Sequence, residues 1–342
     1  MIDIFEVIDL NKCAYSDKNG SYGGLAGRKD GISFYGYDWM VKYPKNLSQY
    51  KGENASYSTS PLSEFLGSHI YQLLGFDVHD TLLGERNGKI VCACKDFAPL
   101  LEKRLLEIRS LKNHTDEELD YLLEEMGGSS TDTHVEDIDE LLLHIYQNPI
   151  LEKVKGVKQR FFEQSIVDMF LNNSDRNSGN WGIIREPGKA DTLAPIYDNG
   201  GSFSTNVSEV KMAHILSGDI LENNVLNVLT AYGKNGHFYS AKKYMNRVGN
   251  IPEYRSAVLR VVPLIEKNLD SIHRLIDNIP DQYITPTGKV LTVMSDLRRE
   301  YYHKQLDIRF QKLLVPEYEN MLQNVSKDLI ADRTKKQINT LL

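Results

Sequence analysis

The stretch Asn172-Asn173-Ser174-Asp175-Arg176-Asn177-Ser178-Gly179-Asn180-Trp181 carries the signal on which the fold assignment of this chain depends. Every residue from 172 to 180 is a turn former or carries a charge, which predicts a loop. The segment before it, residues 157–172, repeats apolar side chains at helical spacing, and a short apolar run follows it. A polar loop of this length between a helix and a strand either caps the structure or holds a ligand.

Asp175 and Asn180 stand five positions apart within this loop. In phosphoryl transfer, an aspartate orients the attacking hydroxyl or accepts its proton, and an asparagine five residues later supplies its carbonyl oxygen to Mg²⁺. The spacing matters because both groups must reach one reaction centre from one loop. Taken alone, an aspartate and an asparagine at this distance are more often simple turn formers.

A second acidic segment, Ile196-Tyr197-Asp198-Asn199-Gly200-Gly201-Ser202, begins shortly after the first. Residues 181–184 and 193–197 are expected to form a short hairpin that leads into it. An aspartate at the end of a strand, followed by glycines, is well placed to coordinate a hard cation, and two oxygen ligands with ATP phosphates and water make a Mg²⁺ site. The order helix, Asp175, Asn180, hairpin, Asp198 therefore favours one nucleotide-metal site over unrelated turns.

The first hundred residues are rich in strand signals and contain one lysine in a notable setting. Residues 32–43 predict a strand or a bent pair of strands, with Lys42 among large apolar neighbours. Lys42 is either an edge lysine that prevents aggregation or a charge aimed at phosphates. Upstream lies a glycine-dense turn that either forms a hairpin or lets backbone N–H groups approach phosphates, although it is no Walker A motif. Its glycines are Gly23, Gly24 and Gly27.

The remaining signals divide the chain into a small lobe and a large helical lobe. Ser60 is expected to cap a helix that carries Pro61 in its first turn and ends at Gly75, followed by strands over 78–83 and 89–97. Helical patterns dominate from residue 99, and after 206 the chain reads as mostly helical. Without β-α-β alternation, the pattern favours a two-lobed α+β fold, with a small antiparallel β-rich lobe over 1–98 and a large helical lobe over 99–342.

These motifs together resemble the HipA-like serine/threonine kinases, whose fold is similar to the phosphoinositide-kinase branch of the protein-kinase-like superfamily. The tract from Asp175 to Asn180, followed by a strand and Tyr197-Asp198, looks like their catalytic and metal-binding loops. Residues 39–44 look like the strand that carries the ATP-binding lysine, and Ser63-Glu64-Phe65-Leu66 looks like the opening of their helix. The resemblance covers roughly residues 20–205.

The resemblance implies a role for each catalytic residue. Asp175 would be the catalytic base, Asn180 and Asp198 would be the Mg²⁺ ligands, and Lys42 would contact the ATP phosphates. Glu64 is a candidate partner of Lys42, although helical spacing places it opposite the apolar stripe.

The resemblance also implies an adenine site and a modification site. The stretch Cys94-Lys95-Asp96-Phe97 would be the hinge between the lobes, and its backbone would bind adenine. HipA-like kinases phosphorylate a serine in their own glycine-rich loop. Ser21, next to the glycines, is therefore a candidate for autophosphorylation.

The predicted function is an ATP- and Mg²⁺-dependent serine/threonine kinase acting on a protein substrate. The family tends to have histidine or lysine between its aspartate and asparagine. This chain has Arg176, Asn177 and Ser178 there, a sequence closer to that of lipid kinases. A lipid or small-molecule kinase is therefore one alternative. A nucleotide-binding regulatory module that acts through the helical lobe is another.

Composition narrows the setting. The formal charge of −7 argues against direct nucleic-acid binding, and no apolar run is long enough for a membrane span. Cys13, Cys92 and Cys94 are too few for a disulfide framework, and the last two are expected to be buried strand thiols. The acidic N-terminus does not resemble a signal peptide, so we expect a cytoplasmic protein or one exported without a cleaved signal. The oligomeric state is left open.

Overall fold

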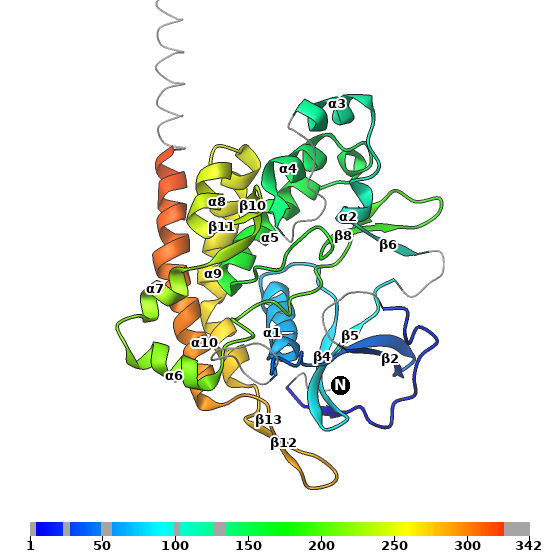
Figure 1. Cartoon of the computed structure of the whole chain (residues 1–342), viewed down its shortest axis with the longest axis vertical. Coiled ribbons are helices and arrows are strands. Elements are labelled where there is room, and N and C mark those ends of the chain that lie inside the picture. Colours follow the sequence, from blue (N-terminus) through cyan, green and yellow to red (C-terminus); the bar gives the residue numbers. More distant parts are fainter. Residues whose placement is uncertain (1–4, 23–27, 49–56, 99–102, 126–134, 325–342) are drawn as a thin grey trace, which may run out of the picture.

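The computed structural model describes residues 5–22, 28–48, 57–98, 103–125 and 135–324. A small curled sheet with one helix occupies one end of the molecule, and a larger, mainly helical part occupies the other (Figure 1). This is the predicted α+β, two-lobed arrangement of the protein-kinase-like fold.

The small sheet has five strands in the order β1-β4-β5-β3-β2. All pairs are antiparallel except β1 with β4, which is parallel, so the predicted antiparallel sheet has one parallel edge. Successive side chains of a strand point to opposite faces. Trp39, Val41 and Tyr43 therefore pack in a small core on the outer face, whereas Lys42 belongs to the inner face. The strands are β1 (Ile8–Asp9), β2 (Lys29–Phe34), β3 (Tyr37–Lys42), β4 (Thr81–Arg86) and β5 (Lys89–Lys95).

The helix α1 (Ser60–Leu73) covers the inner face of this sheet and packs on its other side against α9 (Pro252–Asp277). Its N-cap is Thr59 rather than the predicted Ser60, because the Thr59 N–H is engaged by the Thr205 carbonyl (2.9 Å) and the chain turns helical one residue later. Every residue of α1 from Pro61 to Tyr71 is buried. This stretch therefore has no solvent face, contrary to the predicted single apolar stripe, and only the C-terminal residues Gln72 and Leu73 are exposed.

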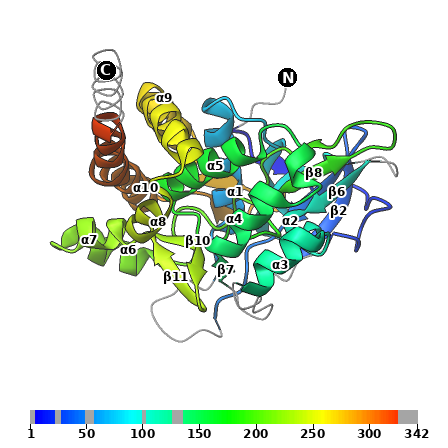
Figure 2. The same ribbon diagram turned by 90° about the horizontal axis from the view of Figure 1, so that it is seen from above.

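The larger part is built around α5 (Val157–Leu171) and α9, which lie side by side (Figure 2). Two hairpins interrupt the region after residue 206, which the sequence predicts as mostly helical. One of them, β12–β13, reaches the small sheet, where the Lys289 Nζ donates to the Gly88 carbonyl (3.4 Å). The helices are α2 (Ile108–Leu111), α3 (Glu117–Glu125), α4 (Ile138–Gln147), α6 (Glu209–Ser217), α7 (Leu221–Leu226), α8 (Ala241–Val248) and α10 (Asp296–Arg309); the 3-10 turn is Leu151–Lys153 and the π-helical turn is Phe310–Leu314. The further strands are β6 (Arg104–Glu107), β7 (Glu136–Asp137), β10 (Leu229–Lys234), β11 (His237–Ser240), β12 (Gln282–Ile284) and β13 (Val290–Thr292).

The expected hairpin after residue 180 is present but shorter than predicted. Strand β8 (Gly182–Arg185) pairs with β9 (Thr192–Leu193) and, on its other side, with β6. Ile196 instead forms a parallel bridge with Val78, just before β4. This bridge fixes the segment that leads to Asp198 against the segment that leads into the small sheet.

Cys13, Cys92 and Cys94 are free thiols, and the last two are buried in β5 as predicted. Across the described ranges, the helices are all too short or too polar to cross a membrane.

Candidate active site

The site is organised around Lys42, the last residue of β3. Its Nζ lies 2.7 Å from the Glu64 Oε2 of α1 and 2.8 Å from the Asp198 Oδ1. Burial opposes the charge on Lys42, but Asp198 and Glu64 outweigh it and raise the pKa of the ammonium well above its usual value. One lysine thus joins a strand, a helix and an acidic loop that lie far apart in the sequence.

Glu64 is fully buried and has partners on both of its oxygens. While Oε2 contacts Lys42, Oε1 accepts the backbone N–H of Asn199 (3.1 Å) and lies 3.1 Å from the His79 Nε2. Burial disfavours the carboxylate, yet Lys42 and His79 lower its pKa below the ordinary value. The structure places the candidate partner Glu64 in direct contact with Lys42, although it lies opposite the expected apolar stripe, because residues 61–71 of α1 are buried on every side.

Lys29 is a second lysine on this face that the sequence reading did not single out. It pairs directly with Lys42 in the β2–β3 register, and side chains of directly paired residues leave the same face of a sheet. Burial and then the neighbouring charge of Lys42 lower the pKa of Lys29. Two ammonium groups side by side on the inner face form a natural environment for phosphates.

The loop that carries Asp175 is shaped by its asparagines. Asn172 ends α5 in the left-handed conformation (φ 58°), and the Asn173 Oδ1 accepts the Asp175 N–H (3.2 Å). The Asn177 Nδ2 donates to the Asp175 Oδ1 (3.0 Å), and the Asn180 Nδ2 donates to the Asp175 backbone carbonyl (2.5 Å). With its amide nitrogen used in this way, Asn180 presents its carbonyl oxygen as the remaining polar atom.

The two acidic loops lie in contact. A Cβ placed on Gly201 would lie 3.0 Å from the Asp175 Cβ, so only glycine allows the Asp198 loop to approach so closely. The Asp175 side chain is exposed at the surface, although protein atoms near its carboxyl reduce its contact with bulk water. Burial, followed by repulsion from Asp198, therefore raises the pKa of the Asp175 carboxyl. The two carboxylates face the same small region.

Arg176 is buried directly beneath this region and holds the two loops together. Its guanidinium bonds Asp168 of α5 (2.9 Å), the Asn180 carbonyl (2.9 Å), the Tyr197 carbonyl and the Asn199 Oδ1 (2.5 Å). From the sequence alone, Arg176 is notable only as a departure from the residues usual in the family. Its spacing from Asp168, eight residues earlier on a helix, gave no local signal of this pairing.

The expected hinge spans the end of β5, because Cys94 and Lys95 belong to the strand and Asp96 and Phe97 follow it. The Asp96 N–H donates to the Asp38 carbonyl (2.9 Å), and its Oδ2 accepts Lys18 (2.5 Å) and the Tyr22 hydroxyl (3.2 Å). The Phe97 ring lies 5.5 Å from the Tyr197 ring, beside the acidic loop.

The turn that carries Ser21 is tied to this hinge through Lys18, because the Ser21 Oγ donates to the Lys18 carbonyl (2.7 Å). Lys95, the last residue of β5, points its ammonium over the Tyr37 ring (3.9 Å). Gly23, Gly24 and Gly27 lie outside the described residues.

The donor set fits a magnesium-nucleotide complex. Asp198 and Asn180 offer carboxylate and amide oxygens, which are the ligands that Mg²⁺ prefers. The Asp175–Asp198 repulsion marks a place where added positive charge is stabilising. Lys42 and Lys29 provide cations on the opposite side, where phosphates would lie.

Fold and site together define a kinase-like phosphotransferase. Over 311 residues the chain is 30% identical to the serine/threonine-protein kinase CtkA of Helicobacter pylori, covering 90% of this chain and 86% of that protein. The crystal structure of that proinflammatory kinase matches with a TM-score of 0.76 and 28% identity, over 93% of this chain and 98% of the other. The chain belongs to the CtkA family of serine/threonine-protein kinases.

A more distant likeness concerns the fold alone. HipA of Shewanella oneidensis, solved with HipB and operator DNA, matches with a TM-score of 0.50 at 12% identity, over 87% of this chain and 67% of the other. No family model matches the chain.

Proposed function

We propose that this protein is an ATP- and Mg²⁺-dependent serine/threonine kinase that transfers the γ-phosphate of ATP to a hydroxyl of a protein substrate. The observation that carries the proposal is the meeting of Lys42 with both Glu64 and Asp198, with Asp175 in the adjoining loop. A lysine held by a helix glutamate and an acidic loop is the arrangement that kinases use to position ATP phosphates.

Lys42 is the proposed contact to the ATP phosphates. Its ammonium is held on the inner face by Glu64, so it is oriented before the nucleotide arrives. Lys29 lies next to it and adds a second positive charge. We expect both to bind phosphate oxygens through charge-assisted hydrogen bonds.

Asn180 and Asp198 are the proposed Mg²⁺ ligands. When bound, the ion offsets negative charge on the phosphates. Asn180 is oriented by its bond to the Asp175 carbonyl, and Asp198 by Lys42. Arg176 fixes the backbone at both ligands by donating to the carbonyl of Asn180 and to that of Tyr197, the residue before Asp198.

Asp175 is the proposed base that orients the acceptor hydroxyl and takes its proton at Oδ1 or Oδ2. Asn177 holds one of these oxygens, so the carboxylate has a defined direction. The exposure of Asp175 leaves it accessible to a large acceptor such as a protein side chain.

The proposed lobes are 1–98 and 99–342, with adenine bound by the backbone of the hinge at Lys95, Asp96 and Phe97. Ser21 is the proposed autophosphorylation site. Its turn is anchored to Asp96 through Lys18 and Tyr22, which keeps it near the hinge.

The setting of Arg176 removes the sequence argument for a lipid acceptor. The sequence departs here from the family's histidine or lysine, but the guanidinium is buried in contacts with Asp168 and Asn199. The departure is therefore accounted for by packing and carries no argument for a lipid acceptor. A regulatory module without catalysis has no need of Lys42, Glu64 and Asp198 in direct contact.

The test is Asp175→Asn, assayed with labelled ATP, Mg²⁺, a generic basic protein and phosphoinositide vesicles. Loss of a general base typically costs about 10²- to 10⁴-fold, so kcat should fall by that amount while ATP still binds. Asp191→Asn, a surface aspartate paired with Arg185, is the matched control and should leave the rate unchanged. Full incorporation by Asp175→Asn would remove the proposed base, and label in the vesicles alone would make the acceptor a lipid.

A further inference from the structure

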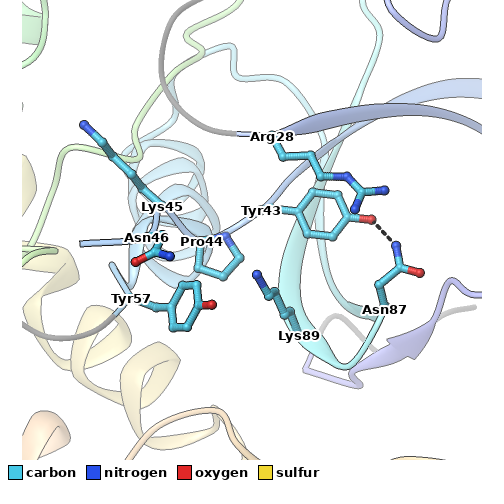
Figure 3. Close-up of a pocket in the computed structure, with 8 residues that line it drawn as sticks. All are labelled: Arg28, Tyr43, Pro44, Lys45, Asn46, Tyr57, Asn87 and Lys89. Atoms are coloured by element: carbon cyan, nitrogen blue, oxygen red, sulfur yellow. Dashed lines mark hydrogen bonds between the residues drawn. The ribbon is translucent and has the colours of Figure 1, made fainter. Parts of the chain in front are cut away.

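A second pocket lies on the outer face of the small sheet, away from Lys42. It has a volume of about 350 Å³, and seven of its eight lining residues carry a polar or charged end group (Figure 3). Tyr43, which follows Lys42 in the chain, points to the opposite face and belongs to the outer core. The lining residues are Arg28, Tyr43, Pro44, Lys45, Asn46, Tyr57, Asn87 and Lys89.

The pocket carries an excess of positive charge in an acidic protein. Arg28, Lys45 and Lys89 contribute three cations, and none of the eight lining residues is acidic. The nearby Asp30 carboxylate forms ion pairs with the Nε of Arg28 (3.2 Å) and the Nε of Arg86 (3.4 Å). Its single negative charge therefore offsets only one of these two positive charges. In a chain of net charge −7, such a local concentration of cations attracts anions selectively.

The cations are held in place by aromatic rings before any ligand binds. The Arg28 guanidinium lies 4.7 Å from the Tyr43 ring centroid, and the Lys89 Nζ lies 4.4 Å from that of Tyr57. In Figure 3 the Lys89 ammonium extends into the space between the two rings, whereas Lys45 extends outward from the rim. Ring contacts of this kind favour a cation without consuming its hydrogen-bond donors, although Arg28 also donates to both oxygens of Asp30 (3.2 Å each).

Tyr43 and Asn87 provide a rigid wall. The Tyr43 hydroxyl donates to the Asp30 Oδ2 (2.7 Å) and accepts the Asn87 Nδ2 (2.9 Å). Asn87 (φ 55°) and Gly88 (φ 72°) are both left-handed, as in the tight turns that join twisted strands. This turn fixes where Lys89 starts and so directs its ammonium toward the pocket.

We propose that this pocket binds a phosphate monoester group. Arginine and lysine together make strong charge-assisted bonds to phosphate oxygens, and the amides of Asn46 and Asn87 and the Tyr57 hydroxyl can add neutral ones. The volume is at the small end of ligand sites, which suits one phosphorylated side chain of a peptide or a small free phosphate. Its position on the face opposite Lys42 makes it a docking site, separate from phosphoryl transfer.

The experiment measures fluorescence anisotropy of a short labelled peptide with one phosphoserine among alanines. Lys89→Gln should weaken its binding by at least about tenfold, the usual cost of one hydrogen bond to a charged group. Asn46→Asp, which adds a negative charge while keeping the side-chain shape, should weaken it as well. Lys243→Gln is the matched control, because Lys243 also lies over a tyrosine ring (Tyr239, 4.1 Å) but on α8, and it should change nothing.

Competition decides the source of the phosphate. Tighter binding of the phosphopeptide than of inorganic phosphate assigns the pocket to a phosphorylated side chain, and equal affinities assign it to free phosphate. A magnesium complex of a non-hydrolysable ATP analogue should not displace the peptide. Three results would overturn the proposal. The ATP analogue displaces the peptide, the unphosphorylated peptide binds equally well, or both Lys89→Gln and Asn46→Asp keep full binding.

Discussion

Lys42 and Arg176 each join segments that lie far apart in the sequence, but they do so in different surroundings. The Lys42 side chain is 14% exposed, and its partner Asp198 is 35% exposed. The Arg176 side chain is 2% exposed, and its partner Asp168 is 6% exposed. Both cations have raised pKa values because carboxylates outweigh the cost of burial, so both remain charged.

The difference separates a contact that can be exchanged from one that is permanent. The proposed phosphate would replace Asp198 as a partner of Lys42, because Asp198 is much more exposed than the other partner, Glu64. Arg176 has no such alternative, because its guanidinium is already bonded to Asp168, to the Asn180 carbonyl and to Asn199. We therefore expect changes at Arg176 to affect folding and changes around Lys42 to affect ligand binding.

The largest expected effect is that of Arg176→Met on stability. Removing one partner of a buried ion pair leaves Asp168 as an uncompensated charge and typically costs about 3–5 kcal/mol. Arg185→Met is the matched control, because Arg185 makes a similar bidentate pair with Asp191 at the surface and should cost at most about 1 kcal/mol. Urea unfolding measures both. Equal losses for the two variants would show that Arg176 is not the internal anchor described above.

Asp198→Asn should act mainly on the ligand. Even residues that only support metal ligands cost about 10- to 100-fold in affinity when replaced, so a direct ligand should cost at least that much in Mg²⁺·ATP affinity. The unfolding midpoint should change far less than in Arg176→Met, because Asp198 lies partly in solvent. Calorimetric titration with Mg²⁺·ATP measures the affinity. An unchanged value would move the metal site elsewhere.

The smallest expected effect concerns pH and Asp175. A base must be ionised to accept a proton, so kcat/KM should fall as pH drops through the pKa of Asp175. Burial and Asp198 raise this pKa, and the decline should therefore begin above the ordinary aspartate value of about 3.9. A pH–rate profile under conditions where the fold is intact measures it.

The raised pKa of Asp175 also affects the stability of the fold. A carboxyl whose pKa is higher in the folded than in the unfolded state costs stability when ionised, above the unfolded pKa. Asp175→Asn should therefore unfold at neutral pH no earlier than the native chain. Earlier unfolding, or an acid limb at or below the ordinary aspartate value, would contradict the environment assigned to Asp175.

The sequence predicts the parts of this site that depend on local rules. Turn formers identify the Asp175 loop, strand alternation places Lys42, and Pro61 marks the start of α1. What it misses are contacts made through space. Local patterns carry no information on the partners of Arg176, and they gave the wrong environment for Glu64 because helical spacing cannot show that a second layer covers the polar side.

The missed hairpins have a related cause. Strands β10 and β11 lie directly between the helices α7 and α8, so their patterns run into those of the helix ends. His79 and Lys29 contribute to the site through residues that are distant in sequence, Glu64 in the first case and Lys42 in the second. An isolated histidine or lysine gives no sign of such neighbours.

The packing of α1 on both sides has a consequence for how such an enzyme is controlled. In many protein kinases, activity is switched by moving the corresponding helix and breaking its ion pair with the lysine. Here the Tyr71 hydroxyl anchors α1 to Asp168 (2.8 Å), and α9 covers its far side. Swinging the helix outward would expose much of the interior, so we expect an enzyme that is assembled in its working state and is regulated by its supply, its location or its access to substrates.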